Sequence, residues 1–293
     1  YARLRLLLPR SHQFTIRSHA DLPKPKQERE GDYEVHTWLV ENHQGHYRPA
    51  DMPAWYFPYP MVEVSEYQTW DEVAQWGHAL FDPALNQSVD WPTAMAIIDN
   101  QQMSQTEKAA ALLNLVQQEI RYFGIETGVN ALRPSLPLET VARRYGDCKD
   151  KTVVLTRLLR QAGIEAYGVL VSAQKERGVQ DLLPGPHVFD HAIVMARIDG
   201  TSYWLDPTAT HQGQKLENIG FFDYGYGLVL QAENGGLTEL AAPLLIKDSI
   251  EVEQNFQINS DASTELAMKF VRQGKPAENT RQSIANIGIK EWD

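Results

Sequence analysis

Residues 190–207 read DHAIVMARIDGTSYWLDP, and this stretch decides the fold that we expect for the middle of the chain. Two largely apolar runs, 190–198 and 201–205, flank the dipeptide Asp199-Gly200. An Asp-Gly pair between two such runs is typical of the tight turn of a β-hairpin, because both residues tolerate a positive φ. The two runs are therefore predicted to be neighbouring antiparallel strands.

The segments before this hairpin have helical patterns. Ser104 and Glu107 have the spacing of a capping box, and Gly124 is a plausible helix stop. Apolar residues between them recur at helical spacing, namely Ala109, Leu112, Leu113, Val116, Ile120 and Phe123. Two more helices are expected over 137–145, ended by Gly146, and over 148–162, ended by Gly163. Helices followed by hairpin strands, rather than alternating with them, predict an α+β fold.

The first part of the chain has the pattern of a β-rich domain with one helix. Strands are expected over 3–8, 33–40 and 61–65. Thr69 and Glu72 form another capping-box pattern and predict the start of a helix, whereas Pro83 and Pro92 favour a loop over 82–100. Four aromatic residues lie within 53–60, where we expect a packed irregular segment.

These patterns predict three regions. A β-rich domain with one helix would occupy 1–95, and a core of helices packed on an antiparallel sheet would occupy 96–242. The beginning of a C-terminal β-rich domain would occupy 243–293, starting at Pro243. Further strands are expected over 166–173, 226–230, 250–258 and 264–271. Because the chain begins at Tyr1 with a strand already under way, we expect it to be a piece of a longer protein.

Composition excludes several classes of function. The chain is 43% hydrophobic and 22% charged, as globular proteins are, and its net charge of −11 argues against a nucleic-acid partner. The longest apolar runs have five residues, so no transmembrane segment is expected. A single cysteine excludes an internal disulfide and a multi-cysteine zinc site. We expect neither a metal nor a cofactor.

That cysteine, Cys148, lies where a nucleophile would be favoured. Asp147 is a good N-cap and Asp150 occupies the reciprocal position, so Cys148 would be the first residue of a helix. The unpaired N–H groups and the positive dipole end of a helix N-terminus favour a thiolate and stabilise an oxyanion. The alternative, a small buried hydrophobic residue, fits the polar neighbours of Cys148 less well.

A base and its orienting partner are expected on the hairpin. His191 begins the first strand and Asp206 ends the second, just before Pro207. Pairing across the turn brings Asp206 to within about two residues of the position opposite His191. A carboxylate there would hold one imidazole nitrogen and fix its tautomer. A buried core histidine and a strand-end cap are the alternative interpretations.

At this point three separated motifs resemble a known family. They are Tyr145-Gly-Asp-Cys-Lys-Asp-Lys151, Asp190-His-Ala-Ile-Val194 and Tyr203-Trp-Leu-Asp-Pro-Thr208, with Ile120-Arg-Tyr122 and Leu132-Arg-Pro134 upstream. Together they resemble the bacterial transglutaminase-like superfamily over roughly 101–210. That family's fold is similar to that of papain-like cysteine proteases. Residues 1–95 are similar to an uncharacterised β-rich domain that often precedes such cores.

The resemblance implies a Cys-His-Asp catalytic triad. Cys148 would be the nucleophile, His191 the general base and acid, and Asp206 the residue that orients the imidazole. The reaction would be acyl transfer on a peptide or protein amide through a thioester. Water as the second substrate gives a peptidase or amidase, and an amine gives a cross-linking transglutaminase. An exported protein of the periplasm or cell envelope is expected from the same resemblance.

Three alternatives are weighed against this prediction. The same fold can serve as a non-catalytic peptide-binding module, and the aromatic segment 54–59 can serve as a carbohydrate- or peptide-binding surface. The deglycosylating branch of the superfamily carries a paired-cysteine zinc site, which this chain with its one cysteine does not have.

Gln117 and Gln118 are oxyanion donors by residue type, but we expect both to face solvent.

Overall fold

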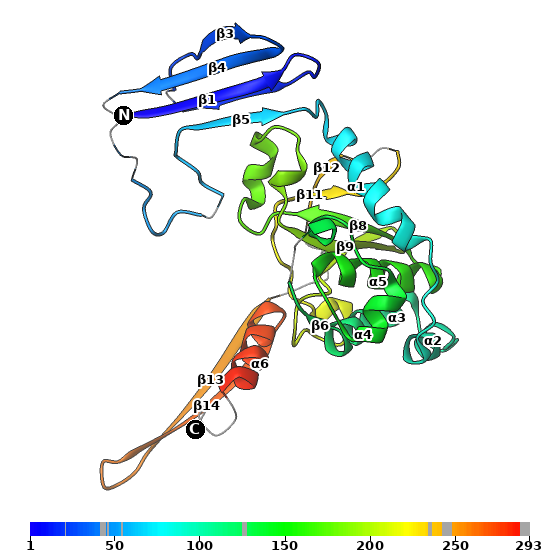
Figure 1. The fold of residues 1–293 in the computed structure, drawn as a ribbon. Coiled ribbons are helices and arrows are strands. Elements are labelled where there is room, and N and C mark those ends of the chain that lie inside the picture. The colour runs from blue at the N-terminus through cyan, green and yellow to red at the C-terminus, as the bar shows by residue number, and fades with distance from the viewer. Residues whose placement is uncertain are drawn as a thin grey trace. The chain divides into compact units, whose positions relative to one another are not determined.

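The computed structural model describes residues 1–20, 22–41, 45, 47–53, 55–124, 128–233, 236–241 and 248–287 (Figure 1). The chain forms two compact units, each assembled from separate segments. The first unit consists of 1–79, 170–191 and 224–240, and the second of 80–169, 192–223 and 241–293. A domain boundary after residue 95 stays a prediction, and the one placed at Pro243 lies outside the described residues.

The first unit contains two small antiparallel sheets and a further antiparallel pair of strands. Strand β4 (Tyr33–Val40) pairs with both β1 (Ala2–Pro9) and β3 (Lys26–Glu30), whereas β2 (Thr15–His19) pairs with β5 (Met61–Ser65). Strands β11 (Tyr226–Val229) and β12 (Leu237–Glu239) form the third pair. The strands expected over 33–40 and 61–65 are confirmed, and β2 and β3 add to them.

Two helices occupy the region around residues 70–98. Helix α1 (Trp70–Leu85) begins where the capping pattern predicts, because Thr69 Oγ1 accepts a bond from Glu72 N at 3.3 Å. The loop expected over 82–100 is wrong: α1 continues to Leu85, and α2 (Pro92–Ile98) follows. Proline at the first helical position loses no intrahelical hydrogen bond, which is why Pro92 starts a helix instead of preventing one.

The core of the second unit is formed by helices over a sheet. Helix α3 (Gln105–Glu119) packs against α5 (Cys148–Gln161), and α4 (Pro137–Arg143) packs on α5 (Figure 1). The shared core includes Leu112, Leu113, Val116, Leu155, Leu158, Val194 and Leu205. Short 3-10 turns lie at Gly128–Ala131, Glu176–Asp181, Pro186–Val188 and Leu216–Asn218 in the two units.

Two of these helices end earlier than their sequence patterns predict. Helix α3 ends at Glu119, because the chain that follows it forms strand β6 (Arg121–Tyr122), which pairs in parallel with β7 (Tyr145–Gly146). Phe123 is therefore exposed and does not continue the buried helix face. Helix α4 ends at Arg143, because Arg144 takes a left-handed conformation with φ of 59°.

The hairpin that decides the fold is confirmed. Strands β9 (His191–Ile198) and β10 (Thr201–Leu205) pair antiparallel, with Thr201 opposite Ile198, and β8 (Glu165–Val171) lies on the other side of β9. Asp199 and Gly200 have φ values of 49° and 76°, as the expected tight turn requires. The fold class is α+β, as the sequence predicts.

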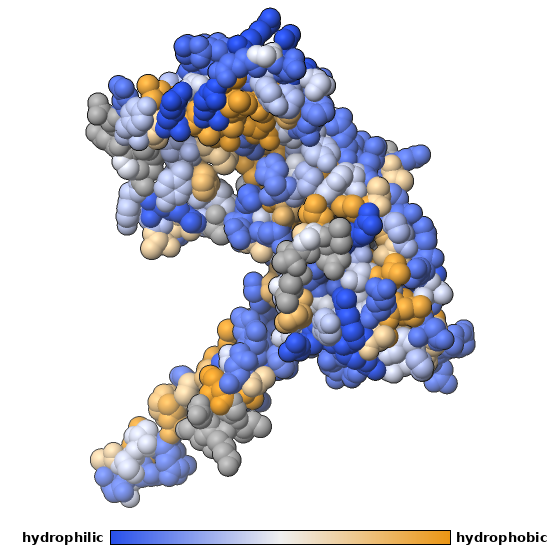
Figure 2. All heavy atoms as spheres, in the orientation of Figure 1, coloured by the Kyte–Doolittle hydropathy of each residue, from blue (hydrophilic) through white to orange (hydrophobic). Residues whose placement is uncertain are grey.

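The C-terminal segment of the second unit is a hairpin followed by a helix. Strands β13 (Ser249–Ile258) and β14 (Thr264–Gln273) are confirmed, whereas helix α6 (Lys275–Ile287) was not predicted. Exposed apolar side chains gather on the hairpin (Figure 2), among them Ile250, Val252, Phe256, Leu266, Met268 and Phe270. No helix in the described ranges is long and apolar enough to cross a membrane.

The capping box of α3 yields a first prediction. Ser104 Oγ accepts a bond from Glu107 N at 3.3 Å, and the Glu107 carboxylate accepts one from Ser104 N at 2.8 Å. We expect Ser104→Ala to lower the free energy of unfolding by about 1 kcal/mol, measured by urea denaturation, because the backbone N–H of Glu107 loses its partner. Ser104→Asp should keep most of the stability, and equal stability of the alanine variant would contradict the role.

Candidate active site

Cys148 is the first residue of α5, as predicted. Its N-cap is Asp147, whose carboxylate accepts a bond from Asp150 N at 3.1 Å, while the Asp150 carboxylate accepts one from Asp147 N at 3.3 Å. The capping box therefore fixes the backbone on both sides of the thiol. Cys148 is 3% exposed.

The charged residues around Cys148 form a buried network that stabilises the helix start. Lys149 Nζ donates to Asp147 Oδ2 at 2.8 Å, and the Arg143 guanidinium donates to the Asp150 carboxylate. Ser135 N donates to Asp150 Oδ1 at 2.7 Å. Because buried carboxylates need partners, these bonds explain the charged residues of the motif without assigning them to catalysis.

Gly146 is required by close packing before Cys148. A Cβ atom at this position would lie 2.7 Å from Asp150 Cβ and 3.1 Å from Thr140 Cγ2. Its carbonyl accepts a bond from Phe123 N at 2.8 Å, next to the parallel pair β6 and β7. The segment that leads into Cys148 is thus held on one side by β6 and on the other by the capping box.

Asp206 directly follows β10 and is 8% exposed. Leu205 pairs with Val194, so the same register continues to Ile193 beside Asp206, two residues from His191, as the sequence predicts. Asp206 Oδ1 accepts bonds from Thr208 N at 2.8 Å and from Thr208 Oγ1 at 2.7 Å. This turn fixes the carboxylate at the end of the strand.

Gln117 corrects one expectation. It does not face solvent: it is buried on α3, where Nε2 donates to the carbonyl oxygen of Asp206 at 2.8 Å and to Gln212 Oε1 at 2.7 Å. The expectation of a solvent-facing side chain is wrong because the chain after Asp206 covers this side of α3. Gln118 is exposed, as predicted.

Lys151 is a functional candidate that the sequence alone did not single out. It lies one helical turn after Cys148, is 1% exposed, and donates from Nζ to the carbonyl oxygen of Ile120 at 2.6 Å. Burial lowers the pKa of its ammonium group to about 8, and the negative charge of Asp206 partly opposes that shift. A buried cation thus acts on the carboxylate that the sequence assigns to the triad.

His191 begins β9, as predicted, and belongs to the first unit. The preceding residue, Asp190, holds the local backbone: its carboxylate accepts bonds from Ala173 N at 2.7 Å and from Ser172 Oγ at 3.1 Å. The His191 ring lies against Tyr224, with 5.9 Å between the ring centroids. Asp190 is therefore an anchor for the start of this strand, which explains the Asp-His dipeptide.

One hydrogen bond links α5 to the start of β9. Thr152 Oγ1 donates to the carbonyl oxygen of Ala192 at 3.0 Å. Cys148, Thr152, Ala192 and Asp206 all belong to the second unit, whereas His191 is the last residue of a segment of the first. The position of the His191 ring relative to the sulfur and the carboxylate stays a prediction.

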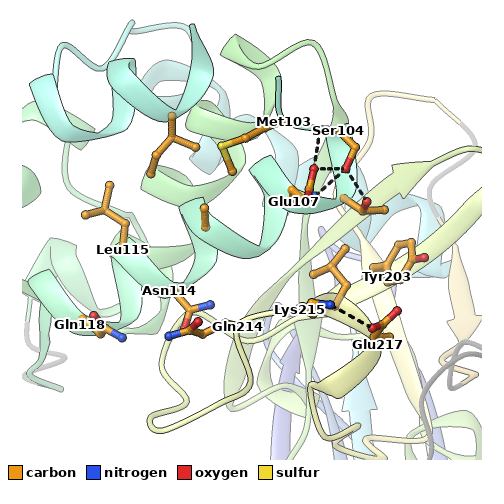
Figure 3. Close-up of a pocket in the computed structure, with 14 residues that line it drawn as sticks. Met103, Ser104, Glu107, Asn114, Leu115, Gln118, Tyr203, Gln214, Lys215 and Glu217 are labelled. Atoms are coloured by element: carbon orange, nitrogen blue, oxygen red, sulfur yellow. Dashed lines mark hydrogen bonds and ion pairs between the residues drawn. The ribbon is translucent and has the colours of Figure 1, made fainter. Parts of the chain in front are cut away.

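Each unit has a hollow that is lined by other residues. In the second unit a hollow of about 880 Å³ is lined by α3 and the chain after β10, including Glu107, Asn114 and Lys215 (Figure 3). In the first unit a hollow of about 660 Å³ is lined by Trp55, Tyr56 and Phe57. Within the described residues, no group of three or more His, Cys, Asp or Glu side chains is arranged to hold a metal ion.

Comparisons with known proteins agree with the fold. Residues 93–206 match the sequence model of the Transglutaminase-like superfamily. The crystal structure of a candidate protease from Parabacteroides distasonis superposes with a TM-score of 0.60 and 16% identity, over 81% of this chain and 44% of that one. The chain thus spans less than half the length of that protein.

A candidate cysteine protease from Cytophaga hutchinsonii matches at a TM-score of 0.29 with 12% identity, over 92% of this chain and 80% of that one. No curated protein matches the chain. The superfamily match begins with α2 and ends at Asp206, and so contains both Cys148 and His191. Residues 93–206 of this chain are therefore similar to the transglutaminase-like superfamily.

Proposed function

We propose that the protein catalyses thiol-dependent acyl transfer on peptide or protein amides, as a cysteine peptidase or amidase or as a transglutaminase-like enzyme. The observation that carries the proposal is the position of Cys148, at the capped N-terminus of α5 inside the superfamily core. The triad is completed by His191 and Asp206. Support comes from the bond between Thr152 and Ala192, which ties the helix of the nucleophile to the strand of the base.

The proposed reaction has two steps. His191 takes the proton of the Cys148 thiol, and the sulfur attacks the amide carbonyl carbon. The C–N bond then breaks, the leaving amine takes the proton from His191, and a thioester remains on Cys148. In the second step water or a primary amine loses a proton to His191 and attacks the thioester. The C–S bond breaks and Cys148 regains its proton, giving a carboxylic acid or a new amide.

Each residue has a defined contribution. The dipole of α5 stabilises negative charge at its N-terminus, first on the thiolate and then on the oxyanion of the tetrahedral intermediate. Asp206 would hold one imidazole nitrogen, so that the other faces the thiol, and would stabilise the imidazolium ion. Thr208 binds Oδ1 of Asp206, so we assign Oδ2 to the imidazole. An exported location stays part of the proposal.

A binding function without catalysis is the second candidate. The hollow lined by Trp55, Tyr56 and Phe57 favours it, because exposed aromatic side chains around a concavity are typical of ligand sites. Peptide or carbohydrate binding that survives Cys148→Ala, together with an unreactive thiol, would support this function instead of the enzyme.

Alkylation by iodoacetamide separates the two functions. Because Cys148 is the chain's single cysteine, the mass of the intact protein reports on this thiol alone. We expect alkylation at pH 6 to be at least about tenfold faster than that of glutathione, because a base partner at a helix N-terminus would activate the thiol. Cys148→Ala is the blank, and the urea-unfolded protein shows the rate of an ordinary cysteine. A folded protein that reacts no faster than its unfolded form would contradict catalysis.

The second substrate is tested separately. A peptide library incubated with the protein, with and without a fluorescent primary amine, distinguishes hydrolysis from cross-linking. Release of new carboxyl termini in both samples indicates a peptidase, and incorporation of the amine indicates a transglutaminase-like enzyme.

A further inference from the structure

Gln117 is a buried side chain whose amide makes two bonds to the segment that carries Asp206. Both donor bonds start from Nε2, one to the carbonyl oxygen of Asp206 at 2.8 Å and the other to Gln212 Oε1 at 2.7 Å. A primary amide has two N–H groups, so this donor capacity is fully used. Gln117 is 6% exposed, and water cannot easily replace either bond.

The same chain of bonds continues into the C-terminal segment. Gln212 Nε2 donates to the two carboxylate oxygens of Glu278, on α6, at 3.3 and 3.4 Å. Glu278 also accepts a bond from Gly220 N at 2.6 Å. The Gln212 amide therefore has a defined orientation, with its carbonyl oxygen toward Gln117 and its nitrogen toward Glu278. The order runs from the Asp206 backbone through Gln117 and Gln212 to Glu278.

The α6 end of this chain is closely packed. Glu278 is 5% exposed, and burial raises the pKa of its carboxyl group. A Cβ atom on Gly220 would lie 2.7 Å from Glu278 Oε2 and 2.8 Å from Lys275 Cα, so the backbone of α6 lies directly against this glycine. Buried polar groups in one network are strongly coupled, and removing one member leaves its partners unsatisfied.

We propose that Gln117 is a positioning residue for Asp206, and that α6 supports it through Gln212 and Glu278. This inference rests on the proposed function, because it assigns these residues to holding the carboxylate that orients His191. Gln117 fixes the strand end from the backbone side, while Thr208 holds the carboxylate. The C-terminal segment then contributes to the geometry of the active site without touching the substrate.

The experiment measures the alkylation rate of Cys148 by iodoacetamide at pH 6 and at pH 9. The ratio of the rate at pH 6 to the rate at pH 9 reports how well the imidazolium and Asp206 stabilise the thiolate. A variant that is merely less stable is recognised by its lower melting temperature. Gln117→Leu is expected to lower the rate at pH 6 by about tenfold and to leave the rate at pH 9 within about twofold, because the strand end loses the two buried bonds of Gln117. Gln105→Leu, an exposed glutamine on the same helix, is the matched control and should keep the wild-type ratio.

Two further variants keep the test decisive. Asp206→Asn should lower the ratio more than Gln117→Leu does, and the double variant should be no lower than Asp206→Asn alone, because both changes remove the same support. Glu278→Gln, which keeps size and one acceptor oxygen, should lower the ratio by about threefold. It also provides a readout if Gln117→Leu does not fold.

The outcomes separate the two proposals. If Asp206→Asn changes the ratio but Gln117→Leu and Glu278→Gln keep it at the wild-type value, the positioning role is overturned and the proposed function stands. If wild-type protein itself has the ratio of glutathione, the proposed function is overturned, and the positioning role with it. A drop in the ratio with an unchanged melting temperature supports the inference.

Discussion

Alanine at His191 is expected to reduce kcat on an amide substrate by about 10⁶, close to the loss caused by Cys148→Ala. Both substitutions remove a group that takes part in bond making, so neither partner can act alone. Asp206→Ala should be the mildest of the three, with a loss of about 10⁴, because Asp206 only orients the imidazole. The substrate is a peptide selected by library profiling, and the measurement is initial rate against substrate concentration.

The matched control for this series is His187→Ala. His187 is an exposed histidine only four residues before His191, so its removal changes the same residue type in the same region. We expect its kcat and KM to equal those of the wild type. Full activity of Asp206→Ala would remove Asp206 from the site, and full activity of His191→Ala would refute the triad.

Local sequence signals predicted the elements that carry the candidate site. The capping boxes at Ser104 and Asp147 and the turn at Asp199-Gly200 all occur as expected. Each depends on residues within four positions of one another, so their side-chain chemistry is enough to specify the local backbone. The register of β9 and β10 follows from the turn and brings Asp206 close to its expected position.

Interactions between distant segments were missed for the opposite reason. Gln117 looks like a surface residue from its neighbours, yet the chain after Asp206 covers it, 89 positions away in sequence. The parallel pairing of Tyr122 with Gly146 ends α3 early, and no local pattern in the helix sequence predicts this pairing. Helix α6 was missed because the strands before it set the expectation for the whole segment, although Pro276 and Glu278 are typical of a first helical turn.

The residues around Cys148 have several different structural roles. Gly146 is needed for packing, Asp147 and Asp150 for capping, and Lys149 for neutralising Asp147. The proposed chemistry is assigned to Cys148, and the buried Lys151 lies one helical turn after it. The sequence singled out Cys148 by its polar neighbours and its expected place at a helix N-terminus, whereas Lys151 is distinguished only by its burial.

The second large effect is expected for Lys151. Burial lowers the pKa of its ammonium group to about 8 in the folded protein, from the ordinary value of 10.5. Between these two values the unfolded chain binds more protons than the folded protein, so the free energy of unfolding increases with pH in this window. Below pH 8 the folded protein holds a buried cation, at a cost of about 3 kcal/mol, because each pKa unit corresponds to about 1.4 kcal/mol.

Lys151→Met should remove this dependence. Methionine has a similar length and no charge, so the variant loses the bond to the Ile120 carbonyl at every pH but no longer carries the buried cation. Between pH 7 and pH 10.5 we expect the unfolding free energy of the wild type to increase by about 3 kcal/mol relative to that of the variant. The measurement is urea denaturation at steps of half a pH unit. Lys108→Met, on α3, is the control for a lysine that is only partly buried. If the unfolding free energies of wild type and Lys151→Met change with pH in parallel, the predicted lowering of the Lys151 pKa is wrong.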